Sequence, residues 1–235
     1  MGAMGAMSDW REFWDSPHSI YVNARHKDVH YREIADGIAA FVPGPAARVL
    51  DYGCGEALHA DRVAAVADEL VLCDSAPNVR AAMAARFAGN PRIKVLAPEE
   101  VETLPDGRFD LIVSNSVVQY LTSEELHRLL AMWRRLLAPG GTLVVADVIP
   151  PGVGATSDVI ALLRYAARNG FLFAALLGLA RTAVSPYRKL RSRIGIAQYT
   201  ESAFMQELRS AGFAAERTGN LEHNPVRMSF RARAA

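Results

Sequence analysis

The chain has 235 residues and a formal net charge of +1, with 51% hydrophobic and 22% charged residues. It has room for one large α/β domain or at most two small ones, and its overall charge gives no indication of a nucleic-acid or acidic partner. The charge is uneven, however, because residues 151–235 hold 12 Lys and Arg against 5 Asp and Glu, which favours an anionic ligand or surface near the C-terminal third.

The N-terminal part of the chain is predicted to be helical. Residues 1–8, MGAMGAMS, are typical of an expression remnant and are left out of the fold. Residues 9–42 follow with an aromatic and histidine-rich start, before the Pro-Gly-Pro sequence at 43–45. Their apolar side chains recur at helical spacing, at Ile34, Ile38, Ala39 and Val42. We therefore expect residues 9–44 to form an N-terminal helical segment.

Strand and helix patterns alternate from residue 45 onward. The predicted strands are ARVLDY, ELVLCD, RIKVL, FDLIVSNS and TLVVADV. Continuous Val, Ile and Leu runs separated by helical segments are typical of a parallel sheet covered on both faces. After the helical segment ESAFMQELRSAGF, two more strands are predicted near 213–219 and 226–233. Their connection is too short for a helical crossover, so they should pair antiparallel.

Residues 152–198 interrupt this alternation. They are predicted to be helical and apolar, with little turn punctuation and no second nucleotide-binding pattern, so we interpret them as an insertion into one domain of residues 45–235. Their longest apolar run, residues 171–180, is far shorter than the roughly 20 residues that cross a bilayer. Basic side chains follow this run, at Arg181, Arg188, Lys189, Arg191 and Arg193.

The first strand leads into a glycine turn that carries an acid, VLDYGCGEA at residues 49–57. In a dinucleotide-binding fold, a pyrophosphate lies on the helix N-terminus after such a turn. The carboxylate of Asp51 would repel it, and the third glycine of the dinucleotide fingerprint is replaced by Leu58. Both features disfavour NAD and FAD. They favour S-adenosylmethionine, which carries an ammonium and a sulfonium and no phosphate.

A second acid follows the second strand. Asp74 stands 23 residues after Asp51, where a carboxylate can accept hydrogen bonds from both hydroxyls of a ribose. With these features, residues 45–150 resemble the class I S-adenosylmethionine-dependent methyltransferases. The segments that carry the resemblance are VLDYGCGEA, LVLCDSAPNV, EEVETLPDGRFDLIVSNSVVQYL and LLAPGGTLVVADV.

The resemblance implies a fold and a cofactor. The fold is a three-layer αβα doubly wound sandwich, with a seven-stranded, mostly parallel sheet and an antiparallel last strand; residues 200–233 fit its tail. The family commonly folds its N-terminal helix over the cofactor and inserts a substrate lid where residues 152–198 stand. We therefore expect residues 9–44 to close over S-adenosylmethionine, and a helical lid at 152–198.

The resemblance also assigns roles to individual residues. Residues 51–55 would surround the methionine portion of the cofactor, and Asp74 would bind the ribose. Glu100 is the best match for the acid that meets the adenine amino group. The residues before it, Pro98 and Glu99, allow an alignment shifted by one or two positions. The implied cofactor-binding set is Tyr21, Arg25, Asp51, Gly53, Cys54, Gly55, Asp74, Ser75, Glu100, Val101, Asn115 and Ser116, of which the last two should lie near the sulfonium and methyl group.

Methyl transfer to a hydroxyl or a protonated amine benefits from a base near neutral pKa, and histidine is the usual choice. His26 and His30 are four residues apart, so they share one helix face. His223 lies in the connection between the last two strands. Each has a structural alternative, which is packing of the N-terminal helix for the first two and a surface turn for His223. No third ligand accompanies the His26–His30 spacing, so no metal is expected.

The acceptor is expected to be a small, partly hydrophobic or amphiphilic molecule. The predicted lid either packs on the core and presents a basic surface, or covers such a substrate while its arginines meet a phosphate, a carboxylate or an anionic membrane surface. Nucleic acid is not expected, because the basic residues do not interleave with aromatic ones. The Asn/Asp-Pro-Pro-aromatic signature of base methyltransferases is also absent after the fourth strand. The oligomeric state is left open.

Two functional alternatives differ in class from a methyltransferase. One is a non-catalytic partner subunit that binds S-adenosylmethionine, and the other is an NAD-dependent oxidoreductase, which the acid and the missing glycine of the turn disfavour. Whether oxygen, nitrogen or carbon is methylated is left open. Two cysteines, Cys54 and Cys73, predict no disulfide framework and fit a reducing cytoplasm.

Overall fold

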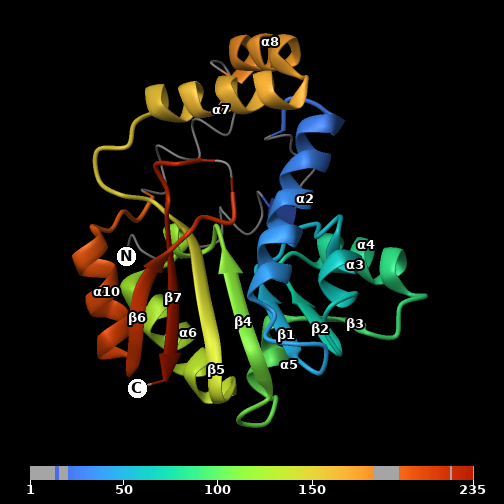
Figure 1. Ribbon diagram of the computed structural model, residues 1–235, viewed down its shortest axis with the longest axis vertical. Helices are drawn as coiled ribbons and strands as arrows, with labels where there is room; N and C mark the ends of the chain where they lie inside the picture. Colours follow the sequence, from blue (N-terminus) through green and yellow to red (C-terminus); the bar gives the residue numbers. More distant parts are fainter. Residues whose placement is uncertain (1–13, 16–20, 183–195, 223, 235) are drawn as a thin grey trace, which may run out of the picture.

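A computed structural model describes residues 14, 15, 21–182, 196–222 and 224–234 (Figure 1). Its centre is a seven-stranded sheet in the order β3-β2-β1-β4-β5-β7-β6. The strands are β1 (Arg48–Tyr52), β2 (Glu69–Cys73), β3 (Ile93–Leu96), β4 (Phe109–Asn115), β5 (Leu137–Val148), β6 (Phe213–Thr218) and β7 (Met228–Ala234).

The direction of the strands matches the prediction. β1 pairs in parallel with β2 and β4, and the parallel pairing continues to β3 on one side and β5 on the other. β7 is antiparallel to both β5 and β6, so six strands run one way and β7 runs against them. The predicted seven-stranded, mostly parallel sheet is therefore confirmed.

Helices cover both faces of the sheet, because its central strands are apolar on both sides. One apolar cluster joins the sheet to α2 (Ala24–Phe41), α3 (Ala60–Ala64) and α4 (Pro77–Phe87). The cluster on the other face includes α5 (Pro98–Glu102), α6 (Ser123–Leu136) and α10 (Glu201–Ser210). Trp133 of α6 is fully buried there and meets the ring of Tyr52 edge-on at 5.5 Å. These layers confirm the αβα sandwich.

The N-terminal helix begins later than predicted. Residues 21–23 form a bend, and α2 starts at Ala24. Asn23 causes this start, because its side chain accepts a hydrogen bond from the backbone N–H of His26 at 2.8 Å and so caps the helix. The expectation of one helix over residues 9–42 is therefore wrong at 21–23. Residues 14 and 15 are helical, while 1–13 and 16–20 lie outside the described residues.

Two helices stand between β5 and α10, at the edge of the sheet where the parallel strands end (Figure 1). They are α7 (Ala155–Asn169) and α8 (Leu172–Thr182). Gly170, at φ +75°, separates them, because a left-handed residue ends an α-helix. Of the predicted insertion at 152–198, residues 183–195 lie outside the described residues, and residues 196–200 have no regular structure. No described helix is both long and apolar enough to span a membrane.

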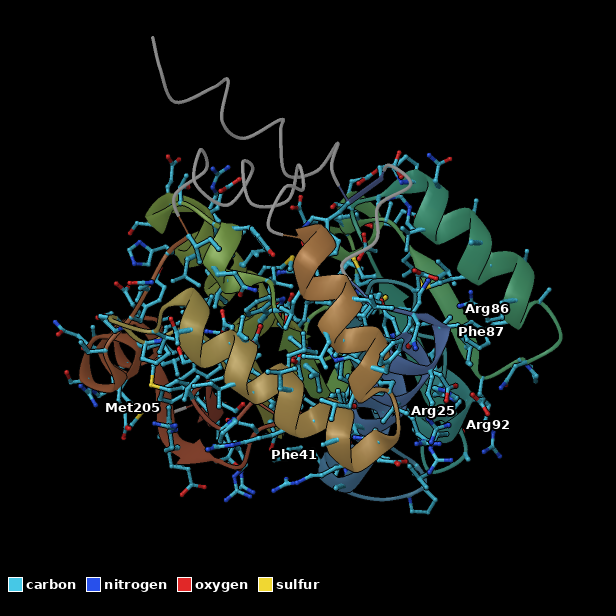
Figure 2. The ribbon with its side chains drawn as sticks, turned by 90° about the horizontal axis from the view of Figure 1, so that it is seen from above. Arg25, Phe41, Arg86, Phe87, Arg92 and Met205 are labelled. Atoms are coloured by element: carbon cyan, nitrogen blue, oxygen red, sulfur yellow. The ribbon has the colours of Figure 1, made fainter. Side chains whose placement is uncertain are left out.

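The pair α7–α8 packs on α2 rather than on the sheet. A small apolar cluster joins the three helices, formed by Val29, Tyr165, Ala166, Phe171 and Ala175. Seen from above, α7 and α8 cross the end of the sheet, with α2 beside them (Figure 2). The N-terminal helix and the inserted helices therefore cover the same edge of the sheet together.

Candidate active site

The turn after β1 needs glycine at two positions. Gly53 and Gly55 have φ values of +76° and +58°, which side chains other than glycine rarely adopt. A Cβ on Gly53 would lie 2.3 Å from the Cγ2 methyl of Val117, in the segment after β4. The turn therefore brings bare backbone up to the chain that follows β4 and leaves no space there for a side chain.

Asp74 fixes the turn from the end of β2. One carboxylate oxygen accepts from the backbone N–H of Gly55 at 2.9 Å, and the other accepts from Ala76 at 2.9 Å. Burial nevertheless raises the pKa of this carboxyl above its ordinary value, although the two backbone N–H groups and Arg80 oppose the shift. Ser75 follows directly, as predicted. The carboxylate thus stands at the turn, and its predicted contact with a ribose stays a prediction.

Asp51 places a second carboxyl under the same turn. Its side chain lies in β1 and is only 8% exposed. Burial raises the pKa of Asp51 to about 7, and the negative charge of Asp74 adds to the shift. Two neighbouring carboxyls with little access to water disfavour a second negative charge, so a bound cation would stabilise their ionised forms.

Tyr31 of α2 covers the turn from the other side. Its hydroxyl accepts from the backbone N–H of Glu56 at 3.1 Å, and a Cβ on Gly55 would lie 2.8 Å from the same hydroxyl. Burial raises the pKa of Tyr31 to about 12, so the group is a neutral hydroxyl. Nothing in the sequence had indicated a contact between Tyr31 and the turn.

We expect Tyr31→Phe to destabilise the protein by about 1–2 kcal/mol, because the N–H of Glu56 loses its acceptor in a partly buried place. Urea unfolding of wild type and variant measures the difference. Tyr199→Phe, which removes a hydroxyl beside Phe204 on the other face of the sheet, is the control, with an expected change within about 0.5 kcal/mol. Equal stability of wild type and Tyr31→Phe would contradict the assigned contact.

The predicted histidine pair lies beside this tyrosine. The ring of Tyr21 is 5.4 Å from both His26 and His30, and the two imidazoles are 6.3 Å apart. His26 stacks on Phe171 at 4.9 Å and accepts from the N–H of Val22. Burial lowers the pKa of both histidines to about 4. Neither is therefore a strong base at neutral pH, and the contacts of His26 are those of a packing residue.

Other predicted residues have contacts away from the turn. Arg25 donates to the carbonyl of Asn169 at the end of α7, at 2.6 Å, and lies beneath the inserted helices (Figure 2). The Sγ of Cys54 is 3.6 Å from the Sδ of Met83, and burial raises the pKa of this thiol. His223 lies outside the described residues. The predicted roles of these residues stay predictions.

The adenine segment differs in detail from its prediction. Glu100 accepts from the N–H of Ala97 at 2.7 Å and caps α5. Val101 is fully buried, and its N–H bonds to the carbonyl of Ala97. Their polar groups are therefore engaged within α5. The charge of Glu99, one position earlier, is among those that raise the pKa of Cys73 at the end of β2.

Asn115 and Ser116 belong to a buried polar cluster that sequence reasoning recognised only in part. Asn115 donates to Glu222 at 2.7 Å, and the Oγ of Ser116 lies 2.7 Å from Asp147 and 3.2 Å from Glu222. Arg227 pairs with Asp147 at 3.1 Å. We call these five residues the polar cluster. Asp147 had a detectable signal, because it stands near the end of TLVVADV as Asp74 stands after ELVLC.

The polar cluster lies next to the glycine turn. β4 pairs with β1 on one side and β5 on the other, so the residues that end β4 stand between the turn and Asp147. The contact between Gly53 and Val117 joins the two places directly. Within the described ranges, no group of three or more His, Cys, Asp and Glu side chains has the arrangement of a metal site.

Comparison with known proteins agrees with this geometry. Residues 50–145, which hold the turn and Asp74, match the family model described as a methyltransferase domain. This match covers about two fifths of the chain. An uncharacterised methyltransferase of Mycobacterium tuberculosis (strain H37Rv) is 34% identical over 127 residues, which are 54% of this chain and 61% of that protein. The chain thus spans about three fifths of that relative.

Two further comparisons describe the extent of the likeness. The trans-aconitate 2-methyltransferase of Streptomyces avermitilis is 35% identical over 139 residues, which are 55% of this chain and 49% of that enzyme. The solved DhpI–SAH complex superposes with a TM-score of 0.61 at 12% identity, over 99% of this chain and 98% of the other. At 12% identity this superposition shows similarity of fold alone, and the similarity extends over nearly the whole of both chains.

The methyltransferase family model covers only part of the candidate site. Asp51, both glycines of the turn, Asp74 and Asn115 lie within residues 50–145. Asp147, Glu222, Arg227 and the whole of α2 lie outside them. The predicted cofactor residues of the turn and of β2 therefore lie inside the matched range, whereas three of the five residues of the polar cluster lie outside it.

Proposed function

We propose that the protein is an S-adenosylmethionine-dependent methyltransferase that moves the sulfonium methyl group to a small acceptor by in-line displacement. One observation carries the proposal. The buried carboxyl of Asp51 and the half-buried carboxyl of Asp74 stand at a left-handed glycine turn that packs too closely on Val117 and Tyr31 to hold a side chain. This combination suits a ligand that is positively charged, lacks phosphate and approaches the backbone closely.

The residues of the turn fit the cofactor part by part. The left-handed backbone at Gly53 and Gly55 shapes the turn that would meet its methionine portion, and Asp51 would face the positive charge there. Asp74 accepts hydrogen bonds from the ribose hydroxyls. The bound cofactor supplies a methyl group activated by the sulfonium, and the protein has to orient the acceptor and exclude water. Tyr31, which holds α2 over the turn, supports closure of the N-terminal helix over this site.

The acceptor is proposed to be partly hydrophobic or amphiphilic. The helices over the site support this, because α8 exposes large apolar side chains, with Phe173 76% and Leu176 51% exposed. We assign α7 and α8 the role of a substrate lid. An anionic membrane surface is a proposed peripheral partner of the same apolar face.

The proposed location is the cytoplasm. Both cysteines are free thiols, which suits a reducing compartment.

Calorimetric titration with S-adenosylmethionine and S-adenosylhomocysteine tests the cofactor, with NAD as the negative control. We expect micromolar binding of both sulfur ligands and none of NAD. Asp74→Ala should weaken binding by about ten- to a hundredfold, which corresponds to about 1.4–2.8 kcal/mol, because the ribose loses a charged acceptor. Asp68→Ala, an exposed acid just before β2, should bind like wild type.

Two results would count against the proposal. Folded wild-type protein that binds neither sulfur ligand would refute the cofactor assignment. Tight binding without methyl transfer to any acceptor in a screen of amines, phenols and carboxylic acids would favour the alternative, a non-catalytic partner subunit.

A further inference from the structure

The polar cluster holds more negative than positive charge. Asp147 and Glu222 are its carboxyls, and Arg227 is its only cation among the described residues. That guanidinium is shared, because it also pairs with Asp158 of α7 at 2.8 Å. His30 lies close enough for the charge of Asp147 to act on it, yet burial keeps the imidazole neutral at ordinary pH. A buried negative charge without a partner is costly, so the cluster is suited to receive a cation.

The hydroxyl of Ser116 bridges the two carboxyls. Its Oγ is within hydrogen-bond distance of both Asp147 and Glu222. A serine has one proton to donate, and an ionised carboxylate can only accept. The two contacts are separate, full hydrogen bonds if one carboxyl is protonated, and otherwise the hydroxyl divides its one proton between two acceptors. Burial, with the charge of Glu222 next, raises the pKa of Asp147 to about 7, and burial also raises the pKa of Glu222, which agrees with one shared proton near neutral pH.

Buried polar atoms that lack a partner point to a ligand. Gln119 is 4% exposed, and its Nε2 lies 3.5 Å from Asp147, yet its Oε1 has no hydrogen bond within the described ranges. The same is true of Oδ1 of Asn115, and of Nη1 of Arg227, which is 8% exposed. Native proteins rarely leave such atoms unpaired. Two of the three are acceptors beside the carboxyls, where the N–H groups of a cation would pair with them.

We infer that Asp147 and Glu222 form the acceptor site of the proposed methyltransferase, where they bind the ammonium group of a small amine and remove its proton before methyl transfer. This inference rests on the proposed function. The cluster has the right place for it, since Asn115 and Ser116 stand between Asp147 and the glycine turn. It also names carboxyls, rather than the predicted histidines, as the base.

The proton and electron balance is complete without another reactant. The carboxyl pair takes the proton from an N–H bond, and the freed lone pair on nitrogen forms the new N–C bond to the methyl group. The C–S bond breaks, and its electron pair stays on sulfur. The proton leaves the carboxyl pair to solvent, so one proton is released for each methyl group transferred to an ammonium.

The test uses the intact protein saturated with S-adenosylhomocysteine. Calorimetry compares two sets of probes of similar shape, which are hexylamine, hexanol and hexanoate, and phenethylamine, phenethyl alcohol and hydrocinnamate. We expect the amine of at least one set to bind about tenfold tighter than its alcohol, or about 1.4 kcal/mol, and the carboxylate to bind worst. Titration in buffers of different ionisation enthalpy should show proton release near pH ~7, because the ammonium stabilises the ionised pair.

Variants locate the effect. Asp147→Asn and Glu222→Gln keep the shape of each side chain but remove its charge, and each should reduce the preference for amine over alcohol to about threefold or less. Asp158→Asn, the control, removes the other partner of Arg227 and leaves both carboxyls of the pair, so amine preference and proton release should persist. Affinity for S-adenosylhomocysteine is measured on every variant, which separates unfolding from a specific loss.

Proton release can also come from other titratable groups near the pair. Among the described residues, the titratable or charged neighbours are Tyr21, His30 and Glu33 from the N-terminal segment, Asp158 and Tyr165 from α7, and Arg227 from the β6–β7 connection. Only the release that disappears in both Asp147→Asn and Glu222→Gln belongs to the pair.

The outcomes distinguish failure of the amine-site inference from failure of the proposed methyltransferase function. Wild-type protein that binds S-adenosylhomocysteine but prefers no amine, or prefers a carboxylate, overturns the inference and leaves the proposed function standing. Amine preference that survives in both variants of the pair overturns it as well. A folded wild type that binds neither sulfur ligand refutes the proposed function, and the inference with it.

Discussion

Gly53→Ala should abolish measurable cofactor binding and destabilise the protein by about 2–5 kcal/mol. The left-handed backbone at φ +76° costs about 1–2 kcal/mol for a residue with a Cβ. The new methyl would also lie 2.3 Å from Cγ2 of Val117, and relieving such an overlap in a packed place costs about 1–3 kcal/mol. The turn is the proposed binding site of the methionine portion of the cofactor. Any backbone movement that relieves the overlap with Val117 therefore displaces the proposed ligand-binding backbone itself.

Gly89→Ala is the matched control for this substitution. It adds the same methyl group after α4, where nothing lies within 4 Å of the new Cβ and the backbone is not left-handed. Urea unfolding and calorimetric titration with S-adenosylhomocysteine should give nearly wild-type values for this variant. If Gly53→Ala behaves in the same way, the turn does not have the assigned geometry.

A double-mutant cycle separates the two causes in Gly53→Ala. Val117→Ala removes the methyl group that the new side chain would meet, so the double variant should recover the overlap term and keep the backbone term. The double variant is then less destabilised than the sum of the two single variants, with a coupling of about 1–3 kcal/mol. Strict additivity would show that Val117 does not limit the space at the turn.

The sheet could be predicted because its signals are local. Each central strand is a continuous apolar run, and the burial of every residue of β2 is the structural counterpart of ELVLC. The turn could also be predicted, since Asp51 and its two glycines are adjacent in sequence and have one chemical interpretation. Asp74 follows from the spacing of the first two strands. In all of these cases the sequence neighbours of a residue determine its place.

The first residue of α2 was not predicted from the sequence, because two local signals compete there. Apolar side chains also occur before α2, at Tyr21 and Val22. The side chain of Asn23 nevertheless accepts from the N–H of His26, so Asn23 is the N-cap and the helix does not extend to earlier residues. Asparagine favours such caps over helix interiors, because its short side chain reaches the free N–H groups of the first turn. Reading the cap first would have placed the start at Ala24.

The polar cluster could not be assembled from sequence, because its members meet only through tertiary structure. Ser116 and Asp147 are 31 residues apart, and Ser116 and Glu222 are 106 apart. The connection from β6 to β7 places Glu222 and Arg227 over the ends of β4 and β5. Strand ends with polar residues, such as Asn115 and Asp147, indicate a site at that edge of the sheet. No sequence pattern marks Glu222, their partner from the β6–β7 connection.

The same geometry bears on the two described histidines that were predicted as candidate bases. His26 and His30 stand near the site, as their spacing indicated, but packing against Phe171 and the inserted helices excludes water and lowers the pKa of both to about 4. Burial disfavours the charged form of every group, so the same environment raises the pKa of Asp147 toward neutrality. A carboxyl rather than an imidazole is therefore the group in this pocket that titrates near pH ~7.

Asp51→Asn should make the stability of the ligand-free protein less sensitive to pH. The folded-state pKa of Asp51 is raised from 3.8 to about 7, so its favourable contribution is present below pH ~4 and is lost as the pH rises through ~7. The difference in unfolding free energy, variant minus wild type, should therefore grow between pH ~4 and pH ~8. Three pKa units set its upper limit at about 4 kcal/mol. His26 and His30 titrate in the opposite sense, but they do so in both proteins and cancel in the difference.

Asp110→Asn provides a control of opposite sign. Arg48 holds the pKa of Asp110 below its ordinary value, so this carboxyl stabilises the protein at neutral pH and loses its contribution as the pH falls. Urea unfolding at several pH values should show Asp51→Asn gaining on wild type as the pH rises, while Asp110→Asn falls behind it. A pH-independent difference for Asp51→Asn would mean that the carboxyl is ionised in the folded protein without a cation. The turn would then lack the electrostatic reason for selecting S-adenosylmethionine, whose sulfonium should otherwise restore the ionised form of Asp51 and tighten binding as the pH rises.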